Sequence, residues 1–209
     1  MRKKSVPPFV KFDHLPLETN MKTQTKISTL LLAVISCCAF ADAKIGSAQT
    51  KAMSGFCPVT ILDSKEWKKG EASVATTYDN RIYYFVNEDA KTTFLAQPAK
   101  YVPAFGGDCS VCIVNVNKRI AGSVFHSIRH KGRLFLFPQD DTKKMFKENP
   151  AKYENGDLAL GGKCAVCKKG GKDEMGKPEF TVIHQNMRYQ FPTKEIMAEF
   201  ARNPSIYVK

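Results

Sequence analysis

The sequence has 209 residues, of which 25% are charged, and a formal net charge of +12. A charge of this sign attracts nucleic acid, acidic polymers and anionic lipid, but the lysines are scattered and no aromatic–basic stretch or known nucleic-acid-reading motif is present. We therefore expect a solvated basic surface and no nucleic-acid partner. The chain also lacks the GxSxG, HExxH, phosphate-loop and paired-carboxylate motifs, which predicts a protein that is not an enzyme.

The first 43 residues have the pattern of a leader. The segment MKTQTKISTLLLAVISCCAFADAK starts at Met21 with a basic front, continues through an apolar middle and ends in the small-x-small exit of a cleavable secretory signal. Residues 1–20 precede this signal, and we interpret them as an over-extended start. Cleavage after Ala43 predicts an exported bacterial protein, either periplasmic, envelope-bound or secreted. The apolar run is too short for an anchor, so we predict no transmembrane helix in the mature chain.

A second exit site lies inside the same segment. The residues AVISC, which end at Cys37, resemble a bacterial lipobox, and cleavage there leaves a lipid-carrying cysteine as the first residue. Cleavage after Ala43 and a lipid anchor at Cys37 both stay open. The cysteines that remain after Ala43 are Cys57, Cys109, Cys112, Cys164 and Cys167. Their odd number leaves at least one unpaired if they oxidise outside the cytosol.

Three segments of the chain repeat one pattern of aromatic residues and proline. In each, a Phe is followed after nine residues by a second Phe, then after four by a Pro and after three by a Tyr. The sets are Phe85/Phe94/Pro98/Tyr101, Phe137/Phe146/Pro150/Tyr153 and Phe191/Phe200/Pro204/Tyr207. A cysteine stands 27 or 28 residues before the first Phe of each set, which aligns GFCPVT, GDCSVC and GKCAVC. The pattern predicts three tandem units, residues 57–108, 109–163 and 164–209.

Each unit is predicted to be a β-hairpin followed by a short α-helix, which makes the fold α+β. β-branched and aromatic residues flank the turn pair Asp79–Asn80, and HKGR and HQNM take its place in the other units. A polar, helix-compatible stretch follows the hairpin. Pro98, Pro150 and Pro204 end it, because the residue before a proline is driven out of helical geometry. One unit of about 50 residues buries little apolar surface, so stacking or stapling of the units is expected.

These residues also carry a family resemblance. The segment CPVT…YDNRIYYFVNEDAKTTFLAQPAKY resembles a YHS domain, a small hairpin-plus-helix module. The segment AKYVPAFGGDCSVCIVNV…KGRLFLF resembles the secreted bacterial branch of that family, and the resemblance covers most of residues 55–207. It implies a tandem array of accessory modules. The metal-linked members of the family place cysteines one and five residues after the first Phe. Here these positions hold Val86 and Ala90, Pro138 and Thr142, and Pro192 and Ile196.

The candidate site consists of the two CxxC pairs, Cys109 with Cys112 and Cys164 with Cys167. A CxxC turn presents two thiolates on one side of a tight loop, which suits zinc or copper(I). The four sulfurs together would form one soft-metal site. Thr60 takes the place of the second cysteine in the first unit, and a hydroxyl is a poor ligand for such an ion.

Two other interpretations of the cysteines stay open. A thiol–disulfide redox protein needs the first cysteine of a pair at the start of a helix. Cys112, however, precedes IVNVN, whose alternation predicts a strand, and Cys167 precedes KKGGK. Alternatively, Cys57, Cys109 and Cys164 are small buried residues, while Cys112 and Cys167 pair or stay reduced.

The histidines are predicted to be structural. His130 and His184 take the place of Tyr78, seven residues before the first Phe of each set, so we expect rings packed at the hairpin edge. We interpret His126 as a strand residue. The resulting hypothesis is an exported, non-enzymatic binding module that takes a soft metal ion through its CxxC pairs. The alternatives are a thiol–disulfide redox protein and a structural envelope protein.

Overall fold

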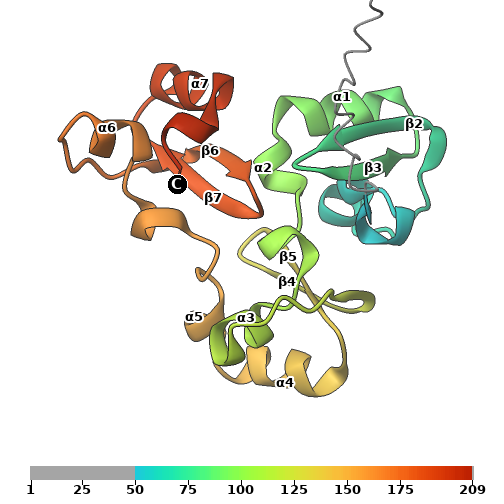
Figure 1. The fold of residues 1–209 in the computed structure, drawn as a ribbon. Helices are drawn as coiled ribbons and strands as arrows, with labels where there is room; N and C mark the ends of the chain where they lie inside the picture. Colours follow the sequence, from blue (N-terminus) through green and yellow to red (C-terminus); the bar gives the residue numbers. More distant parts are fainter. Residues whose placement is uncertain (1–49, 209) are drawn as a thin grey trace, which may run out of the picture. The chain divides into compact units, whose positions relative to one another are not determined.

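The computed structural model describes residues 50–208, which hold three copies of one order of elements (Figure 1). Each copy begins with a kinked turn and a short helix, continues with an antiparallel hairpin and a nine-residue helix, and ends in a short helical turn. We name residues 52–101 unit 1, residues 104–153 unit 2 and residues 159–206 unit 3. The predicted α+β fold, with a hairpin and a following helix in each unit, is confirmed.

The element bounds run in parallel through the three units. Unit 1 consists of η1 (Ala52–Gly55), η2 (Thr60–Ser64), β2 (Glu71–Tyr78), β3 (Arg81–Phe85), α1 (Glu88–Ala96) and α2 (Pro98–Tyr101). Unit 2 consists of η3 (Ala104–Gly107), α3 (Ser110–Val116), β4 (Ser123–His130), β5 (Arg133–Phe137), α4 (Asp140–Glu148) and α5 (Pro150–Tyr153). Unit 3 consists of η4 (Ala159–Gly162), α6 (Ala165–Lys169), β6 (Lys177–His184), β7 (Met187–Phe191), α7 (Lys194–Arg202) and η5 (Pro204–Ile206). A short strand β1 (Thr50–Lys51) pairs in parallel with β3.

The three hairpins share their register and their turn. In each, the last residue of the long strand pairs with the first residue of the short strand: Tyr78 with Arg81, His130 with Arg133 and His184 with Met187. The two residues between them have positive φ, as in Asp79 (44°) and Asn80 (61°). Such turns match the right-handed twist of paired strands, and the predicted turn positions are confirmed. Each register then shifts between the first and the fifth residue of the long strand.

The helices that follow the hairpins end where the prolines predict. The side chain of Asn87 accepts a hydrogen bond from the Ala90 amide at 2.9 Å and caps α1. Helices α1, α4 and α7 each end two residues before a proline. Pro98, Pro150 and Pro204 then occupy the first turn of the next short helix, where an amide proton is not needed.

The repeated aromatic residues form the core of each unit. Phe94, Phe146 and Phe200 are 0–1% exposed. Each of these rings contacts the two buried rings of its short strand at centroid distances of 4.6–5.3 Å. The position shared by Tyr78, His130 and His184 places a further ring edge-on against the helix Phe, at 5.9, 5.6 and 6.1 Å. The predicted packing of these histidines at the hairpin edge is confirmed.

A glycine also repeats at one position of each unit, just before the long strand of the hairpin. A Cβ atom added to Gly70, Gly122 or Gly176 would lie 2.2–2.4 Å from atoms of the facing short strand, which no side chain tolerates. The amide of each glycine donates to a carbonyl of the kinked turn, for example Gly122 to Gly107 at 2.9 Å. These glycines therefore let the chain pass directly over its own hairpin.

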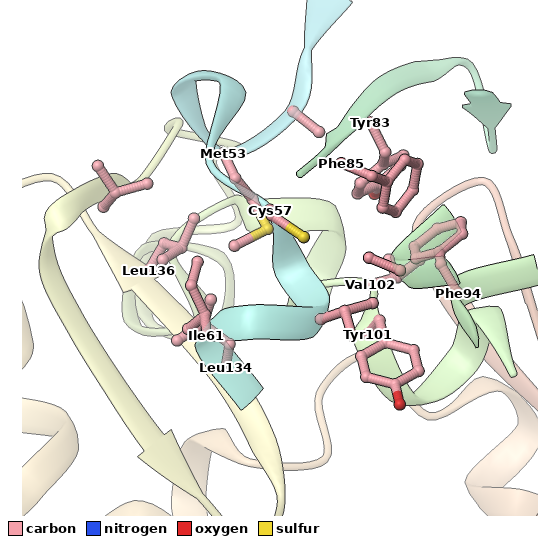
Figure 2. Packing of buried hydrophobic residues seen from close by; sticks show 14 of the residues in the cluster. Met53, Cys57, Ile61, Tyr83, Phe85, Phe94, Tyr101, Val102, Leu134 and Leu136 are labelled. Carbon is pink, nitrogen blue, oxygen red and sulfur yellow. The ribbon is translucent and has the colours of Figure 1, made fainter. Parts of the chain in front are cut away.

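Strand β5 shows how two units share apolar surface. Phe135 and Phe137, on one face, belong to the cluster of unit 2. Leu134 and Leu136, on the other face, belong to the cluster of unit 1, together with Met53, Cys57 and Ile61 (Figure 2). The alternation of side chains along a strand allows both contacts at once.

Two aspartates join the units through polar contacts. The carboxylate of Asp79 accepts hydrogen bonds from the amides of Gln185 and Asn186 at 2.7 and 2.6 Å. These bonds join the turn between β2 and β3 of unit 1 to the turn between β6 and β7 of unit 3. Asp157, which is 1% exposed, accepts from the Phe105 amide and pairs with Arg133 of unit 2 and Arg188 of unit 3.

The predictions for the leader lie outside the described residues. These are the start at Met21, the signal of residues 21–43, its exit after Ala43 and the lipobox at Cys37. Among the helices of residues 50–208, none has the length and apolar character that crossing a membrane requires.

Candidate functional site

Both CxxC pairs lie at the start of a helix. Cys109 immediately precedes α3 and Cys164 immediately precedes α6. The sulfur of the first cysteine accepts a hydrogen bond from the amide of the second, at 3.2 Å for Cys112 and 3.1 Å for Cys167. The expectation that neither pair begins a helix was therefore wrong. The first four residues of IVNVN, Ile113 to Val116, belong to α3, and the fifth, Asn117, caps the end of the helix in a left-handed conformation (φ 52°).

The thiols of each pair are buried beside each other. The first cysteine, like Cys57, is fully buried, whereas Cys112 and Cys167 are 8% exposed. The sulfurs of Cys109 and Cys112 lie 2.7 Å apart. Burial, followed by the neighbouring Cys109, raises the pKa of the Cys112 thiol to about 12. The pKa of Cys167 is raised to about 12 for the same reasons. These thiols are therefore protonated at neutral pH.

The structure does not bring the two pairs together. Cys109 and Cys112 belong to the cluster of unit 2, and Cys164 and Cys167 to that of unit 3. Within residues 50–208, no group of three or more His, Cys, Asp or Glu side chains is arranged to hold a metal ion. The four cysteines predicted to hold zinc or copper are therefore divided between two cores, two in unit 2 and two in unit 3, and their joining in one site stays a prediction.

The polar partner of Cys167 is a carboxylate. Its sulfur lies 3.8 Å from Glu174 Oε2, and the Glu174 carbonyl accepts from the Cys164 amide at 2.8 Å. In unit 1 the hydroxyl of Thr60 donates to the Cys57 carbonyl at 3.1 Å, which places an oxygen where the other units have a second sulfur.

The histidines make local contacts. His130 Nε2 lies 2.6 Å from Glu154, which also pairs with Lys131. These two partners, Lys131 first, lower the pKa of the Glu154 carboxyl. His126 lies in β4, as expected, and its ring contacts Asp140 of α4 at 3.0 Å.

A small groove with aromatic walls lies between units 1 and 2. It has a volume of about 290 Å³ and is lined by Phe56, Trp67, Val124, Phe125, Ser127 and Lys143. Phe125 is 82% exposed and Trp67 is 43% exposed. The ring of Trp67 stands edge-on to that of Phe56 at 5.5 Å, so these two side chains hold each other in place.

A larger cavity is lined by residues of unit 3 at positions equivalent to those that line the small groove in unit 2. It has a volume of about 500 Å³, and from unit 3 its lining includes Pro178, Glu179, Thr181 and Met197. These are the second, third and fifth residues of β6 and the fourth residue of α7. The small groove takes the second, third and fifth residues of β4 and the fourth residue of α4 from unit 2, namely Val124, Phe125, Ser127 and Lys143. Units 2 and 3 thus each line a hollow with the same positions of the fold, but with different side chains.

The basic residues of the larger cavity are already paired. Lys100 contacts Asp63 at 2.8 Å, Lys131 contacts Glu154 at 2.8 Å, and Arg133 and Arg188 share Asp157. The cavity therefore has little charge left with which to attract an anion.

Phe125 and Trp67 are not among the site residues predicted from the sequence, although the sequence carries a signal for Phe125. Aligned along the long strand, the position of Phe125 holds Ser73 in unit 1 and Glu179 in unit 3. An aromatic residue at a position that is otherwise polar marks a surface specific to one unit.

Comparison of the chain with protein-family models, with curated proteins and with solved structures gives no match.

Proposed function

We propose that this chain is an exported, non-enzymatic binding module built of YHS-like units, and that the aromatic groove is its ligand site. One observation carries the proposal: equivalent positions of units 2 and 3 line hollows, while their side chains differ. The central core position, by contrast, keeps its residue in every unit, namely Phe94, Phe146 and Phe200. A hollow that recurs at equivalent positions but is lined by different side chains fits a role in binding a specific ligand.

The groove suits a small molecule with a flat apolar ring and an anionic group. Phe56, Trp67 and Phe125 supply apolar walls, and Lys143 and Ser127 add an ammonium group and a hydroxyl to the lining. A Phe that is 82% exposed leaves most of its apolar surface in water, and covering it is favourable by about 1.5–3 kcal/mol. The groove volume of about 290 Å³ is near the lower end for sites of small ligands.

The remaining parts of the proposal rest on the sequence. Export rests on the signal pattern of residues 21–43, and the family assignment on the repeated YHS-like segments. The non-enzymatic character rests on the lack of the catalytic motifs GxSxG, HExxH, phosphate loop and paired carboxylates in the sequence. Metal binding is not part of the proposal, because the four cysteines are divided between two cores.

The single tryptophan makes the proposal testable by fluorescence. Trp67 is the one tryptophan of the sequence and lines the groove. Titration with 8-anilinonaphthalene-1-sulfonate, which has an aromatic ring system and a sulfonate, should quench Trp67 through energy transfer to the bound dye. Phe125→Ser introduces the residue that unit 1 has at this position, and it should weaken binding about 10- to 100-fold.

Two further variants complete this experiment. Lys143→Met introduces the residue of unit 3 and should weaken binding of the sulfonate while sparing the fold. Met175→Ser removes a side chain that is 59% exposed and lines neither cavity, so binding should stay as in the unchanged protein. Equal affinity in Phe125→Ser, Lys143→Met and Met175→Ser would show that the groove is not the ligand site.

A further inference from the structure

We propose that Cys109 with Cys112, and Cys164 with Cys167, each form a reversible disulfide, while Cys57 stays a thiol. This inference is independent of the proposed ligand site. It rests on two pairs that the fold places in the same arrangement and on a third unit in which the second sulfur is replaced.

The geometry of the pairs carries the inference. In unit 2 the two sulfurs already lie 2.7 Å apart inside one turn of chain, so forming a bond between them requires little movement of the backbone. In unit 3 the same three-residue spacing and the same amide-to-sulfur hydrogen bond recur. All five cysteines of residues 50–208 are thiols in this structure, and each is buried.

Unit 1 provides an internal control. Cys57 is fully buried like Cys109 and Cys164, but the residue three positions later is Thr60, whose hydroxyl donates to the Cys57 carbonyl. Cys57 lies in the cluster of unit 1, apart from the clusters that hold the other four cysteines. Cys57 is therefore as buried as Cys109 and Cys164, but it has no second cysteine three residues later with which to form a disulfide.

The exposure of the sulfurs sets the order of the reaction. Cys112 is 8% exposed and Cys109 is fully buried, so an oxidant reaches Cys112 first. With a low-molecular-weight disulfide as oxidant, the Cys112 thiolate attacks one sulfur, the S–S bond of the oxidant breaks, and one thiolate leaves and takes up a proton. Cys109 then loses its proton, attacks Cys112 Sγ and expels the second thiol. Two protein thiols and one disulfide yield one protein disulfide and two small thiols.

Differential alkylation of the full chain tests the pairing. The protein is incubated with oxidised glutathione at pH 8, quenched with acid and unfolded. Free thiols are then alkylated with one reagent, and the thiols released by reduction with a second. Peptide mass spectrometry should find the second label on Cys109, Cys112, Cys164 and Cys167 and the first label on Cys57. Treatment of the oxidised protein with dithiothreitol before quenching should restore the first label at all five positions.

Single variants test the order of attack. Cys109→Ser should stop at a mixed disulfide and carry glutathione on Cys112. Cys112→Ser should leave Cys109 a thiol, because glutathione does not reach it. Cys57→Ser should show the pairing of the unchanged protein. Far-ultraviolet circular dichroism of each variant establishes that it is folded. The disulfide mapping by differential alkylation uses the unchanged chain, so it tests the pairing even if a variant fails to fold.

Three results would overturn the proposal. The first is that all four cysteines keep the first label after oxidation. The second is a disulfide that joins Cys57 to another cysteine or joins one pair to the other. The third is glutathione on Cys109 in a folded Cys112→Ser protein, which would show that exposure does not set the order.

Discussion

At the scale of single residues, the cysteines differ in how the fold surrounds them. The sulfur of Cys109 accepts from the Cys112 amide, and Cys112 faces it from a slightly exposed position. Burial raises the pKa of Cys112 to about 12, well above that of an ordinary thiol. The reactive thiolate is therefore a small fraction of Cys112 at neutral pH.

This pKa predicts a steep dependence of oxidation on pH. Below its pKa the thiolate fraction grows about tenfold for each pH unit, and thiol–disulfide exchange requires the thiolate. The rate at which Cys112 reacts with oxidised glutathione should therefore rise about tenfold per unit from pH 7 to pH 9 without levelling. Quenched-flow alkylation with peptide mapping measures it. A plateau near pH 8.5, the range of an ordinary thiol, would contradict the raised pKa.

At the scale of elements, each unit is built on one helix phenylalanine that contacts the two buried rings of a short strand. The helix α4 shows how much rests on that residue. Its other side chains are polar or partly exposed, and Phe146 is its one buried residue.

Removal of this ring should be costly. Phe146→Ala should lower the free energy of unfolding by about 3–5 kcal/mol, because it deletes a ring that is 1% exposed and leaves a cavity. Lys147→Ala, at the next and exposed position, should change it by no more than about 0.5 kcal/mol. Urea unfolding followed by circular dichroism measures both. Equal, small changes in the two variants would mean that the aromatic repeat does not mark the core.

At the scale of the described molecule, the units depend on one another. Leu134 and Leu136 of β5 complete the apolar cluster of unit 1, and Ile183 of β6 joins the same cluster. The carboxylate of Asp157 accepts a hydrogen bond from an amide of unit 2 and forms ion pairs with one arginine of unit 2 and one of unit 3. Small units that bury little surface alone gain stability from such shared contacts.

The buried aspartate should therefore be critical for stability. Asp157→Asn leaves Arg133 and Arg188, whose side chains are 18% and 12% exposed, without their negative partner. Breaking a buried ion pair in this way should cost about 3–5 kcal/mol. Asp173→Asn removes the carboxylate of an exposed pair with Lys163 and should cost no more than about 1 kcal/mol. If urea unfolding finds equal midpoints for the two variants, Asp157 does not join the units.

The sequence by itself determined the features that depend on a few neighbouring residues. Turn pairs such as Asp79–Asn80 favour positive φ, a proline ends a helix two residues ahead, and the spacing of Phe94, Pro98 and Tyr101 repeats because each unit builds the same core. Local preference is enough for these, so the sequence predicts the three hairpins and the helix that follows each of them.

The tertiary structure alone decided the elements whose partners are distant in the chain. The alternation of IVNVN predicts a strand, but no neighbouring strand pairs with it. Burial of Ser110, Val111 and Cys112 against their own unit instead favours helix α3. Similarly, only packing separates the two cysteine pairs and brings Phe56 and Trp67 to Phe125. Contacts between residues 50 or more positions apart depend on how the units fold onto each other, and no local pattern in the sequence encodes that arrangement.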